Sequence, residues 1–232
     1  MIKKYQSLID YYKDCFSIVD EFHFNSGVTR DTYRKYIVPK AEKVIPITHN
    51  GINDHRRKKS FEGNCLKIGF VGSAAPYKGL SRLIMALKQL NRNDKWRLDV
   101  WGDAIGQDES LPIYYRGKFT HSAIETVYTT MDIMVVPSLW HETFSLVTLE
   151  ALSYGVPVLV SDTVGAKDIV AQYNPRFVYH SQEELVALLR AIICNRALLE
   201  EYNDKILSME WKHSMKEHAQ EIIDKMYKNV RK

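Results

Sequence analysis

The chain has 232 residues, of which 45% are hydrophobic and 26% are charged, and its formal net charge is +4. This is the composition of an ordinary soluble globular protein, long enough for one large domain or for one domain and a fragment. No apolar run in the sequence reaches the roughly 18–20 residues that a membrane-spanning helix needs. The weak positive charge does not by itself indicate a nucleic-acid partner.

The N-terminal segment and the cysteines indicate the compartment. The segment MIKKYQSLIDYYKD has no apolar signal-peptide core. Cys15, Cys65 and Cys194 lie far apart in the sequence and form no C-x-x-C pair. We therefore expect a cytoplasmic protein with reduced cysteines, no signal peptide, no metal site and no cofactor.

The first 60 residues contain two small strand–helix steps, too few for a second domain. They predict a helix over 1–15, a short strand over 21–27, a helix over 28–37 that ends before Pro39, and a strand over 43–52. Residues 53–64, NDHRRKKSFEGN, are polar and lack a period, so we expect a linker. Its basic run, 55–59, is interpreted either as solvated or as a contact with phosphates or an anionic membrane face.

From residue 66 onward, short apolar runs alternate with helical patterns. The apolar runs predict strands over 66–72, 96–102, 113–119, 132–138 and 156–161. The helical spacing predicts helices over 79–91, 121–131, 144–155, 181–207 and 214–230. Continuous apolar runs are typical of buried parallel strands, so we expect an α/β fold, a Rossmann-like parallel sheet with helices on both faces. Ligands of such sheets bind at the carboxyl ends of the strands.

Two turns follow predicted strands at that edge. GSAAPYKGL (72–80) is not a P-loop, because it lacks the G-K-[ST] end, and it does not contain the dinucleotide fingerprint G-x-G-x-x-G. Its backbone N–H groups and Lys78 are suited to an anion such as a diphosphate; the alternative is a tight turn with a solvated lysine. WGDAIGQDESLP (101–112) either lines a ligand cleft or is a plain connecting loop.

The stretch PSLWHETFSLVTLEALSYGVPVLVSD (137–162) carries two carboxylates in apolar surroundings. Glu142 lies just before or within the first turn of the predicted helix, where a contact with the helix dipole alone would explain it. Glu150 lies on a helix that is apolar nearly all round and therefore buried, so its carboxylate needs hydrogen-bond donors. The hydroxyls of a ligand would serve; the alternatives are a nearby Arg or Lys, or a position at the wet edge.

Helical geometry relates the two glutamates. Eight residues of helix rise about 12 Å and turn about 80° beyond two full turns, so Glu142 and Glu150 are expected on roughly the same side. That rise is close to the span from sugar to ribose in a nucleoside diphosphate sugar. Between them, the free N–H groups of Phe144, Ser145 and Leu146 and the helix dipole suit a diphosphate.

These motifs resemble a known family. ETFSLVTLE (142–150) resembles the E-x7-E arrangement of retaining glycosyltransferases with the GT-B fold, and the whole of 137–162 resembles their family 4. FVGSAAPYKGLSRLIMAL (70–87) is similar to the first turn of the donor domain. VDEFHFNS (19–26) and KVIPITHNGI (43–52) are similar to the end of the N-terminal domain and the interdomain linker, and WKHSMKEHAQEIIDKMY (211–227) to the closing helix.

The resemblance implies three parts of the chain and a role for each site residue. Residues 1–60 would be a remnant of the N-terminal domain with the linker, 61–213 the donor-binding Rossmann-like domain, and 214–232 a crossing helix. Glu150 would hold the ribose hydroxyls, and Glu142, the catalytic candidate, would face the donor sugar. The diphosphate would be bound, without a metal, by Gly72, Ser73, Lys78 and the N–H groups of Phe144, Ser145 and Leu146.

Two departures from the family are visible. The family usually has an arginine where this chain has Ser73. Losing such a charge-assisted contact typically weakens binding by roughly 1.5–3 kcal/mol, unless another Arg or Lys substitutes. The chain also holds one Rossmann-like half and only a remnant of the other, so we expect the N-terminal acceptor site to be largely absent from it, either because the chain is truncated or because a separate partner supplies the site.

We therefore expect the donor-binding half of a retaining, family 4-like glycosyltransferase of cell-envelope polysaccharide biosynthesis. It would use a UDP- or GDP-sugar and no nucleic acid, at the inner face of the membrane, and would be inactive without an acceptor domain or partner chain. One alternative is a non-catalytic subunit of a two-chain transferase, which an open apolar surface near residues 1–60 would favour. The other is an unrelated Rossmann-like enzyme such as a dehydrogenase, against which the missing glycine fingerprint argues.

Overall fold

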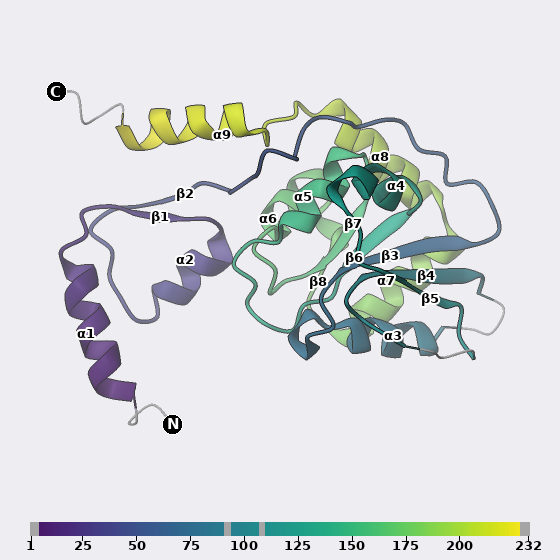
Figure 1. The fold of residues 1–232 in the computed structure, drawn as a ribbon, viewed down its shortest axis with the longest axis horizontal. Coiled ribbons are helices and arrows are strands. Elements are labelled where there is room, and N and C mark those ends of the chain that lie inside the picture. Colours follow the sequence, from purple (N-terminus) through teal and green to yellow (C-terminus); the bar gives the residue numbers. More distant parts are fainter. Residues whose placement is uncertain (1–4, 91–93, 107–109, 228–232) are drawn as a thin grey trace.

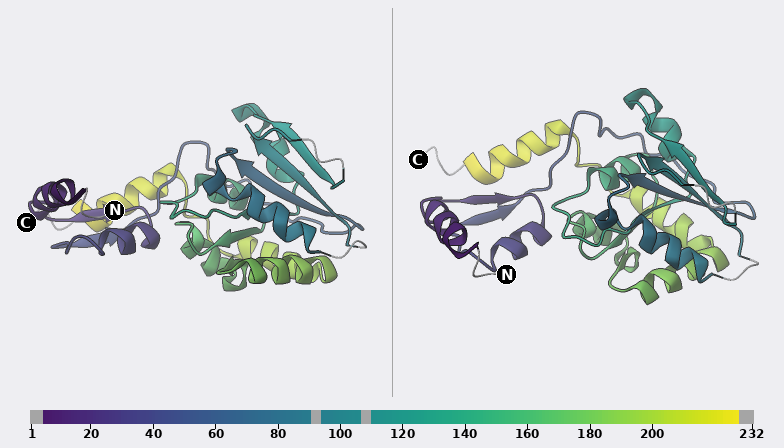
Figure 2. Two further views of the ribbon diagram at one scale, coloured as in Figure 1. Left: turned by 90° about the horizontal axis from the view of Figure 1, so that it is seen from below. Right: turned by 60° about the horizontal axis from the view of Figure 1, so that its bottom comes forward.

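The computed structural model describes residues 5–90, 94–106 and 110–227. They form a large α/β lobe and a small N-terminal lobe, with α9 (Met215–Ile222) lying along the small lobe (Figures 1 and 2). Within these residues, no helix is both long enough and apolar enough to cross a membrane. The predicted helices over 1–15, 79–91 and 214–230 each extend partly outside the described residues.

The small lobe contains two helices and two strands: α1 (Gln6–Ser17), β1 (Phe22–Phe24), α2 (Gly27–Tyr33) and β2 (Glu42–Val44). The two strands are parallel, with Phe22 opposite Glu42. α2 begins where the side-chain oxygen of Ser26 accepts a hydrogen bond from the backbone N–H of Thr29, a favourable N-cap. All four predicted elements are present, although both strands are shorter than predicted.

The large lobe is built on a parallel sheet in the order β5-β4-β3-β6-β7-β8. Its strands are β3 (Leu66–Gly72), β4 (Trp96–Gly102), β5 (Ile113–Gly117), β6 (Ile133–Val136), β7 (Val158–Ser161) and β8 (Val178–Tyr179). Every residue of β6 and β7 is buried, as expected for central strands with helices on both faces (Figures 1 and 2). The predicted α/β fold with a parallel sheet is confirmed.

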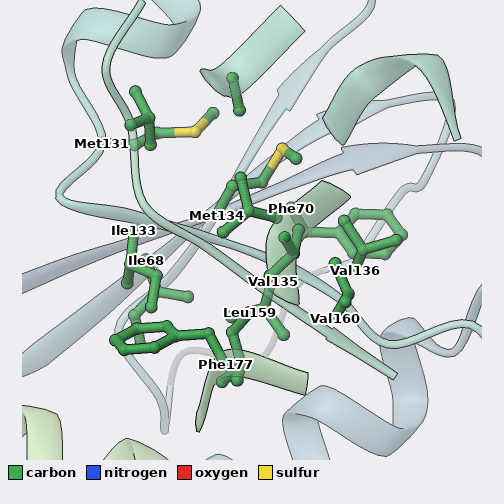
Figure 3. Close-up of a cluster of buried hydrophobic side chains, with 14 of the residues drawn as sticks. Ile68, Phe70, Met131, Ile133, Met134, Val135, Val136, Leu159, Val160 and Phe177 are labelled. Atoms are coloured by element: carbon green, nitrogen blue, oxygen red, sulfur yellow. The ribbon is translucent and has the colours of Figure 1, made fainter. Parts of the chain in front are cut away.

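The centre of the sheet holds the core that positions the site. Figure 3 shows a cluster of buried apolar side chains that includes Ile68, Phe70, Met131, Ile133, Met134, Val135, Val136, Leu159, Val160 and Phe177. Burial of such surface contributes roughly 25 cal/mol per Å². The core fixes β3 against β6, with Ile68 opposite Ile133, and so brings the loops after these two strands together.

The helices of the large lobe differ in detail from the predicted ones. They are α3 (Leu80–Lys88), α4 (Ile124–Thr129), α5 (Leu146–Ser153), α6 (Lys167–Tyr173), α7 (Gln182–Cys194) and α8 (Ala197–Ser208). Short 3-10 turns lie at Pro76–Lys78, His121–Ala123 and Pro175–Phe177, and α9 continues as a π-helical turn over Ile223–Tyr227. The stretch predicted to be helical over 181–207 is helical but forms two helices, because the chain leaves the helical conformation at Asn195 (φ −139°, ψ 96°). The sequence pattern does not predict α6 or the two-residue β8.

The polar segment 53–64 contains no helix or strand, as predicted, and its basic run is largely exposed but also makes contacts within the chain. Arg56 donates hydrogen bonds to two carbonyl oxygens at the end of α8 and lies over the Trp211 ring. Arg57 and Lys58 form ion pairs with α4 and α8, and Lys59 donates to a carbonyl at the end of α4. Residues 55–59 therefore form a basic strap across the large lobe, in which Arg57 and Lys58 are paired with carboxylates but remain exposed.

Candidate functional site

The loops after β3 and β6 meet at the carboxyl edge of the sheet, on the side that faces the small lobe (Figure 1). Lys78 Nζ lies 2.7 Å from Glu142 Oε1, and the lysine side chain is 29% exposed. Gly79 makes this approach possible: its φ is +75°, and a Cβ there would lie 1.9 Å from the carbonyl oxygen of Pro137. Lys78 is therefore held beside Glu142 and is not the solvated lysine of the alternative interpretation.

Glu142 lies in an extended segment. Its carboxylate accepts hydrogen bonds from Lys78 Nζ at 2.7 Å and from Ser138 Oγ at 2.5 Å. Its backbone N–H donates to the carbonyl oxygen of Thr163 at 3.0 Å, and its own carbonyl oxygen accepts from the N–H of Gly165 at 2.8 Å. These bonds fix Glu142 as a bridge to the segment after β7, so a contact with the helix dipole alone does not explain it.

The helix that follows begins later than predicted. α5 starts at Leu146, and its N-cap, Ser145, has a φ of +94°, a left-handed conformation that costs an L-residue roughly 1–2 kcal/mol. Glu142 is therefore off the helix, and the helical rise does not set its distance from Glu150. Within the described part of the chain, no acceptor is found for the backbone N–H groups of Ser145 and Leu146, so these donors are free for an anion.

The segment between Glu142 and α5 is fixed by both lobes. The carbonyl oxygen of Thr143 accepts hydrogen bonds from Ser26 Oγ at 2.6 Å and from Thr29 Oγ1 at 3.2 Å, both at the start of α2. The carbonyl oxygen of Phe144 accepts from the N–H of Ala166 at 2.6 Å. With its carbonyls engaged on both sides, this segment presents its N–H groups in a defined direction.

Glu150 is paired within the chain. Its side chain is 15% exposed, and its two carboxylate oxygens contact His49 Nε2 at 2.9 Å and the Tyr128 hydroxyl at 2.5 Å. The predicted need for hydrogen-bond donors is confirmed, but the donors are a histidine of the linker and a tyrosine of α4 rather than an Arg or Lys. Sequence reasoning missed both.

The tyrosine is a neutral donor. Burial, and then the neighbouring Glu150 carboxylate, raise the pKa of Tyr128 well above its usual range. The phenol therefore stays protonated and donates a hydrogen bond to Glu150. A polar tip on an otherwise apolar helix face was the available signal for Tyr128; His49, in the turn THNG, had no such signal.

The turn after β3 brings Gly72 and Ser73 to the same edge, both half-buried. Beside them, the backbone N–H of Ala74 donates to Asp103 Oδ1 at 2.6 Å, so a carboxylate of the loop after β4 already occupies one donor of this turn. The family's usual arginine is replaced by Ser73, and among the ion pairs of the described residues Lys78 is the cation that pairs with Glu142. These residues also contain no group of three or more His, Cys, Asp or Glu side chains that could hold a metal ion.

Two hollows lie near the site. A cavity of about 720 Å³ separates the small lobe and α9 from α6, and its lining includes Asn25, Ser26, Phe144, Gly165, Asp168 and His213. Burial lowers the pKa of His213 to about 4, so this histidine is neutral at pH 7. A hollow of about 530 Å³ is lined by Ala104, Ile105, Gly106, Tyr115 and Gly117, so the loop predicted over 101–112 does border a hollow; residues 107–109 of that loop lie outside the described residues.

The small lobe exposes much apolar surface. A hollow of about 610 Å³ lies between α1 and α2 and is lined by Leu8, Ile9, Tyr12, Lys13, Phe16, Thr32, Tyr33, Tyr36 and Ile37. Nearby, Ile18 is 78% and Val38 is 96% exposed. The open apolar surface that favours a two-chain arrangement is therefore present.

Known proteins resemble this chain in sequence and in fold. The family model of the glycosyl transferases group 1 matches residues 51–208. The GDP-mannose-dependent alpha-mannosyltransferase of Mycolicibacterium smegmatis is 33% identical over 120 residues, which cover 50% of this chain and 30% of that protein. The crystal structure of HepE from Anabaena in complex with UDP and glucose has a TM-score of 0.74 at 17% identity and covers 94% of this chain and 66% of that chain. The crystal structure of WaaG, a glycosyltransferase involved in lipopolysaccharide biosynthesis, has a TM-score of 0.65 at 20% identity and covers 87% of this chain and 62% of that chain.

The chain thus spans less than half of the mannosyltransferase and about two thirds of the two solved structures. The family match covers most of the large lobe, including the Lys78 turn, both glutamates and the sheet that carries them. The structural match to HepE covers 94% of this chain, so the likeness in fold extends beyond the residues that the family model matches. This chain belongs to the group 1 glycosyltransferases, with its large lobe as the C-terminal domain of a GT-B fold.

Proposed function

We propose that the chain binds a nucleoside diphosphate sugar at the carboxyl edge of β3 and β6, as the donor-binding half of a retaining glycosyltransferase. The observation that carries this proposal is the Lys78–Glu142 pair beside the start of α5, with Glu150 on that same helix. A helix start favours anions through its free N–H groups and its dipole. Lys78 adds a full positive charge next to these donors.

Each group has its own role in the proposed site. Glu150 accepts hydrogen bonds from the ribose hydroxyls, and Glu142 faces the donor sugar. The diphosphate lies between them, on the Lys78 ammonium, the turn of Gly72 and Ser73, and the N–H groups of Phe144, Ser145 and Leu146.

The proposed transfer exchanges one bond at the anomeric carbon. The bond from this carbon to the diphosphate oxygen breaks, and its electron pair stays on the diphosphate. Lys78 and the start of α5 stabilise the charge that develops there, so we propose that no metal ion or cofactor takes part. The acceptor hydroxyl forms the new bond on the same face of the sugar and passes its proton to the leaving diphosphate. Because the old and the new bond lie on the same face, the anomeric configuration is retained.

The donor is proposed to be a UDP- or GDP-sugar. The mannosyltransferase of M. smegmatis is named for its dependence on GDP-mannose, and the HepE structure contains UDP. The description of WaaG supports a role in cell-envelope polysaccharide synthesis. A cytoplasmic protein at the inner face of the membrane suits that role.

Transfer is proposed to need a further Rossmann-like half that carries the acceptor site, in the same polypeptide or in a partner chain. The parallel pair β1–β2 stands apart from the main sheet, whereas parallel sheets are stable when several strands are covered on both faces. The exposed side chains of α1 and α2 would pack against that half. The same surface favours a second candidate, a non-catalytic donor-binding subunit.

Calorimetry tests the binding proposal. The chain is titrated with UDP, GDP and ADP, and we expect one of them to bind at millimolar concentration or below. Glu150→Ala should weaken that binding, while Glu200→Ala, at an exposed position of α8, should not. No binding by the parent contradicts the proposed function, and unchanged binding by Glu150→Ala contradicts the ribose assignment.

Transfer measurements separate the two candidates. The chain is combined with the missing half, and transfer of a labelled sugar is compared between the parent and Glu142→Gln. A catalytic chain loses transfer in the variant. A binding subunit keeps it.

A further inference from the structure

A turn of the linker between the lobes reaches Glu150 directly. His49 Nε2 lies 2.9 Å from Glu150 Oε1, across 101 residues of sequence. The Tyr128 hydroxyl donates to the other oxygen, across 22 residues. Because the side chains of His49 and Glu150 are 34% and 15% exposed, this cluster lies at an open edge that a ligand can reach.

The hydrogen bonds determine which nitrogen of His49 carries the proton. The backbone N–H of Gly51 donates to His49 Nδ1 at 3.0 Å, so Nδ1 is an acceptor and carries no proton. The proton is therefore on Nε2, which donates to Glu150. His49 is neutral in this arrangement, because both bonds cannot be made by an imidazolium.

Neutral donors leave the carboxylate its negative charge. A carboxylate has about four lone-pair sites, and His49 and Tyr128 occupy one on each oxygen of Glu150. One site on each oxygen remains for further donors. Two neighbouring hydroxyl groups, such as those of a ribose, match this pair of sites.

The turn that carries His49 is tightly packed. A Cβ at Gly51 would lie 2.7 Å from His121 Cε1 and 2.8 Å from His49 Cε1. On the α4 side, the Tyr128 ring stacks on Tyr154 with ring centroids 5.8 Å apart. The two donors are thus held by the linker turn and by α4, so that rotation of the Glu150 carboxylate is restricted from both sides.

We propose that His49 is a positioning residue for ribose recognition, which orients the Glu150 carboxylate so that it accepts hydrogen bonds from both ribose hydroxyls. This inference rests on the proposed nucleotide binding and adds a residue outside the E-x7-E stretch. It also gives the linker a direct contact with the nucleotide site. The ligand class that this contact selects is a ribonucleoside diphosphate over its 2′-deoxy form.

The test compares UDP with 2′-deoxy-UDP by calorimetry on the full chain. Since the 2′-hydroxyl donates to a charged acceptor, the parent should prefer UDP about tenfold. His49→Ala should reduce the preference to about twofold, mainly through weaker UDP binding, and His49→Gln should restore part of it. The control is His180→Gln, which removes another histidine–carboxylate contact, to Asp162 at 3.0 Å, and should leave the preference unchanged.

Several results would overturn the inference. One is a preference of His49→Ala for UDP over 2′-deoxy-UDP that equals the parent's. Another is an equal loss of affinity for both nucleotides, which would indicate that His49 has a merely structural role. If His49→Ala does not fold, His49→Gln and ¹⁵N NMR of the parent decide, because a proton on Nδ1 contradicts the proposed geometry. Absence of UDP binding by the parent has a different meaning: it removes the proposed function itself, and the ribose role with it.

Discussion

Glu142 and a bound diphosphate compete for the same lysine, and this competition gives a prediction with an unusual sign. Lys78 Nζ lies 2.7 Å from Glu142 Oε1 in the ligand-free chain. A diphosphate oxygen that accepts from another N–H of the same tetrahedral ammonium group would lie about 4.4 Å from the carboxylate, and two unit charges at that separation repel by roughly 0.9 to 4 kcal/mol for dielectric constants between about 80 and 20. Both side chains are partly exposed, so a value near the lower end applies, about 1 kcal/mol.

Glu142→Gln is therefore expected to bind UDP about fivefold more tightly than the parent, because it removes the repulsion and frees Lys78. Lys78→Met should weaken UDP binding by about 10- to 100-fold, the usual effect of a lost charge-assisted contact. Calorimetry at about 50 mM and 500 mM salt measures both effects, and the gain should shrink at the higher salt because screening reduces it. The control Glu125→Gln removes an exposed glutamate that pairs with Arg57 and should leave UDP binding unchanged. Weaker or unchanged binding by Glu142→Gln would refute the reasoning.

Further variants test how the site is supported. Arg56→Met should lower the free energy of unfolding by about 2–3 kcal/mol, because two carbonyls at the end of α8 lose their donor. Lys58→Met, on the same strap but exposed, should change the free energy of unfolding by about 0.5 kcal/mol or less. Equal losses for the two variants in denaturant titrations would contradict this. Gly79→Ala, where a Cβ would meet a backbone oxygen, should cost about 3 kcal/mol or more; Gly117→Ala, with nearly the same φ but open space, should cost only about 1–2 kcal/mol. Burial lowers the pKa of Lys59 from 10.5 to about 8, so its protonation destabilises the fold below pH 8. This shift corresponds to about 3.4 kcal/mol, of which the lost hydrogen bond to the Thr129 carbonyl offsets about 1–2 kcal/mol. Lys59→Met should therefore stabilise the chain by about 1–2 kcal/mol at pH 7, and this gain should fade between pH 8 and 10.5. A gain that does not depend on pH would rule out the buried charge as its cause.

Much of the large lobe can be predicted from the sequence because its signals are local. The continuous apolar runs that form β3, β6 and β7 are read within single short windows, and the parallel sheet follows from their alternation with helices. Lys78 is also a local signal, since it lies in a turn of small residues directly after a strand. Strand ends at the same edge then place this lysine next to the loop of Glu142.

The start of α5 has no such signal. Ser145 adopts a φ of +94°, which L-residues rarely do, and nothing in the sequence next to it requires this. The conformation is imposed by neighbours that are distant in sequence, since the flanking carbonyl of Thr143 accepts from Ser26, 117 residues away. His49 and Tyr128, the hydrogen-bond partners of Glu150, are likewise 101 and 22 residues away from it in the sequence. The residues next to Glu150 therefore do not reveal them. The helical distance predicted between Glu142 and Glu150 is wrong, because it requires both residues to lie on one helix and α5 starts only at Leu146.

The distant contacts have a consequence for how the two lobes and the donor act on each other. The small lobe donates to the carbonyl of Thr143, one residue after Glu142, through Ser26 and Thr29. The linker donates to Glu150 through His49. Both carboxylates of the motif are therefore held from outside the large lobe: Glu142 through the adjacent peptide by the small lobe, and Glu150 directly by the linker. If these bonds orient the site as proposed, an arrangement of the lobes that keeps them binds the donor more tightly than one that breaks them. By thermodynamic reciprocity, donor binding must favour that arrangement by the same free energy.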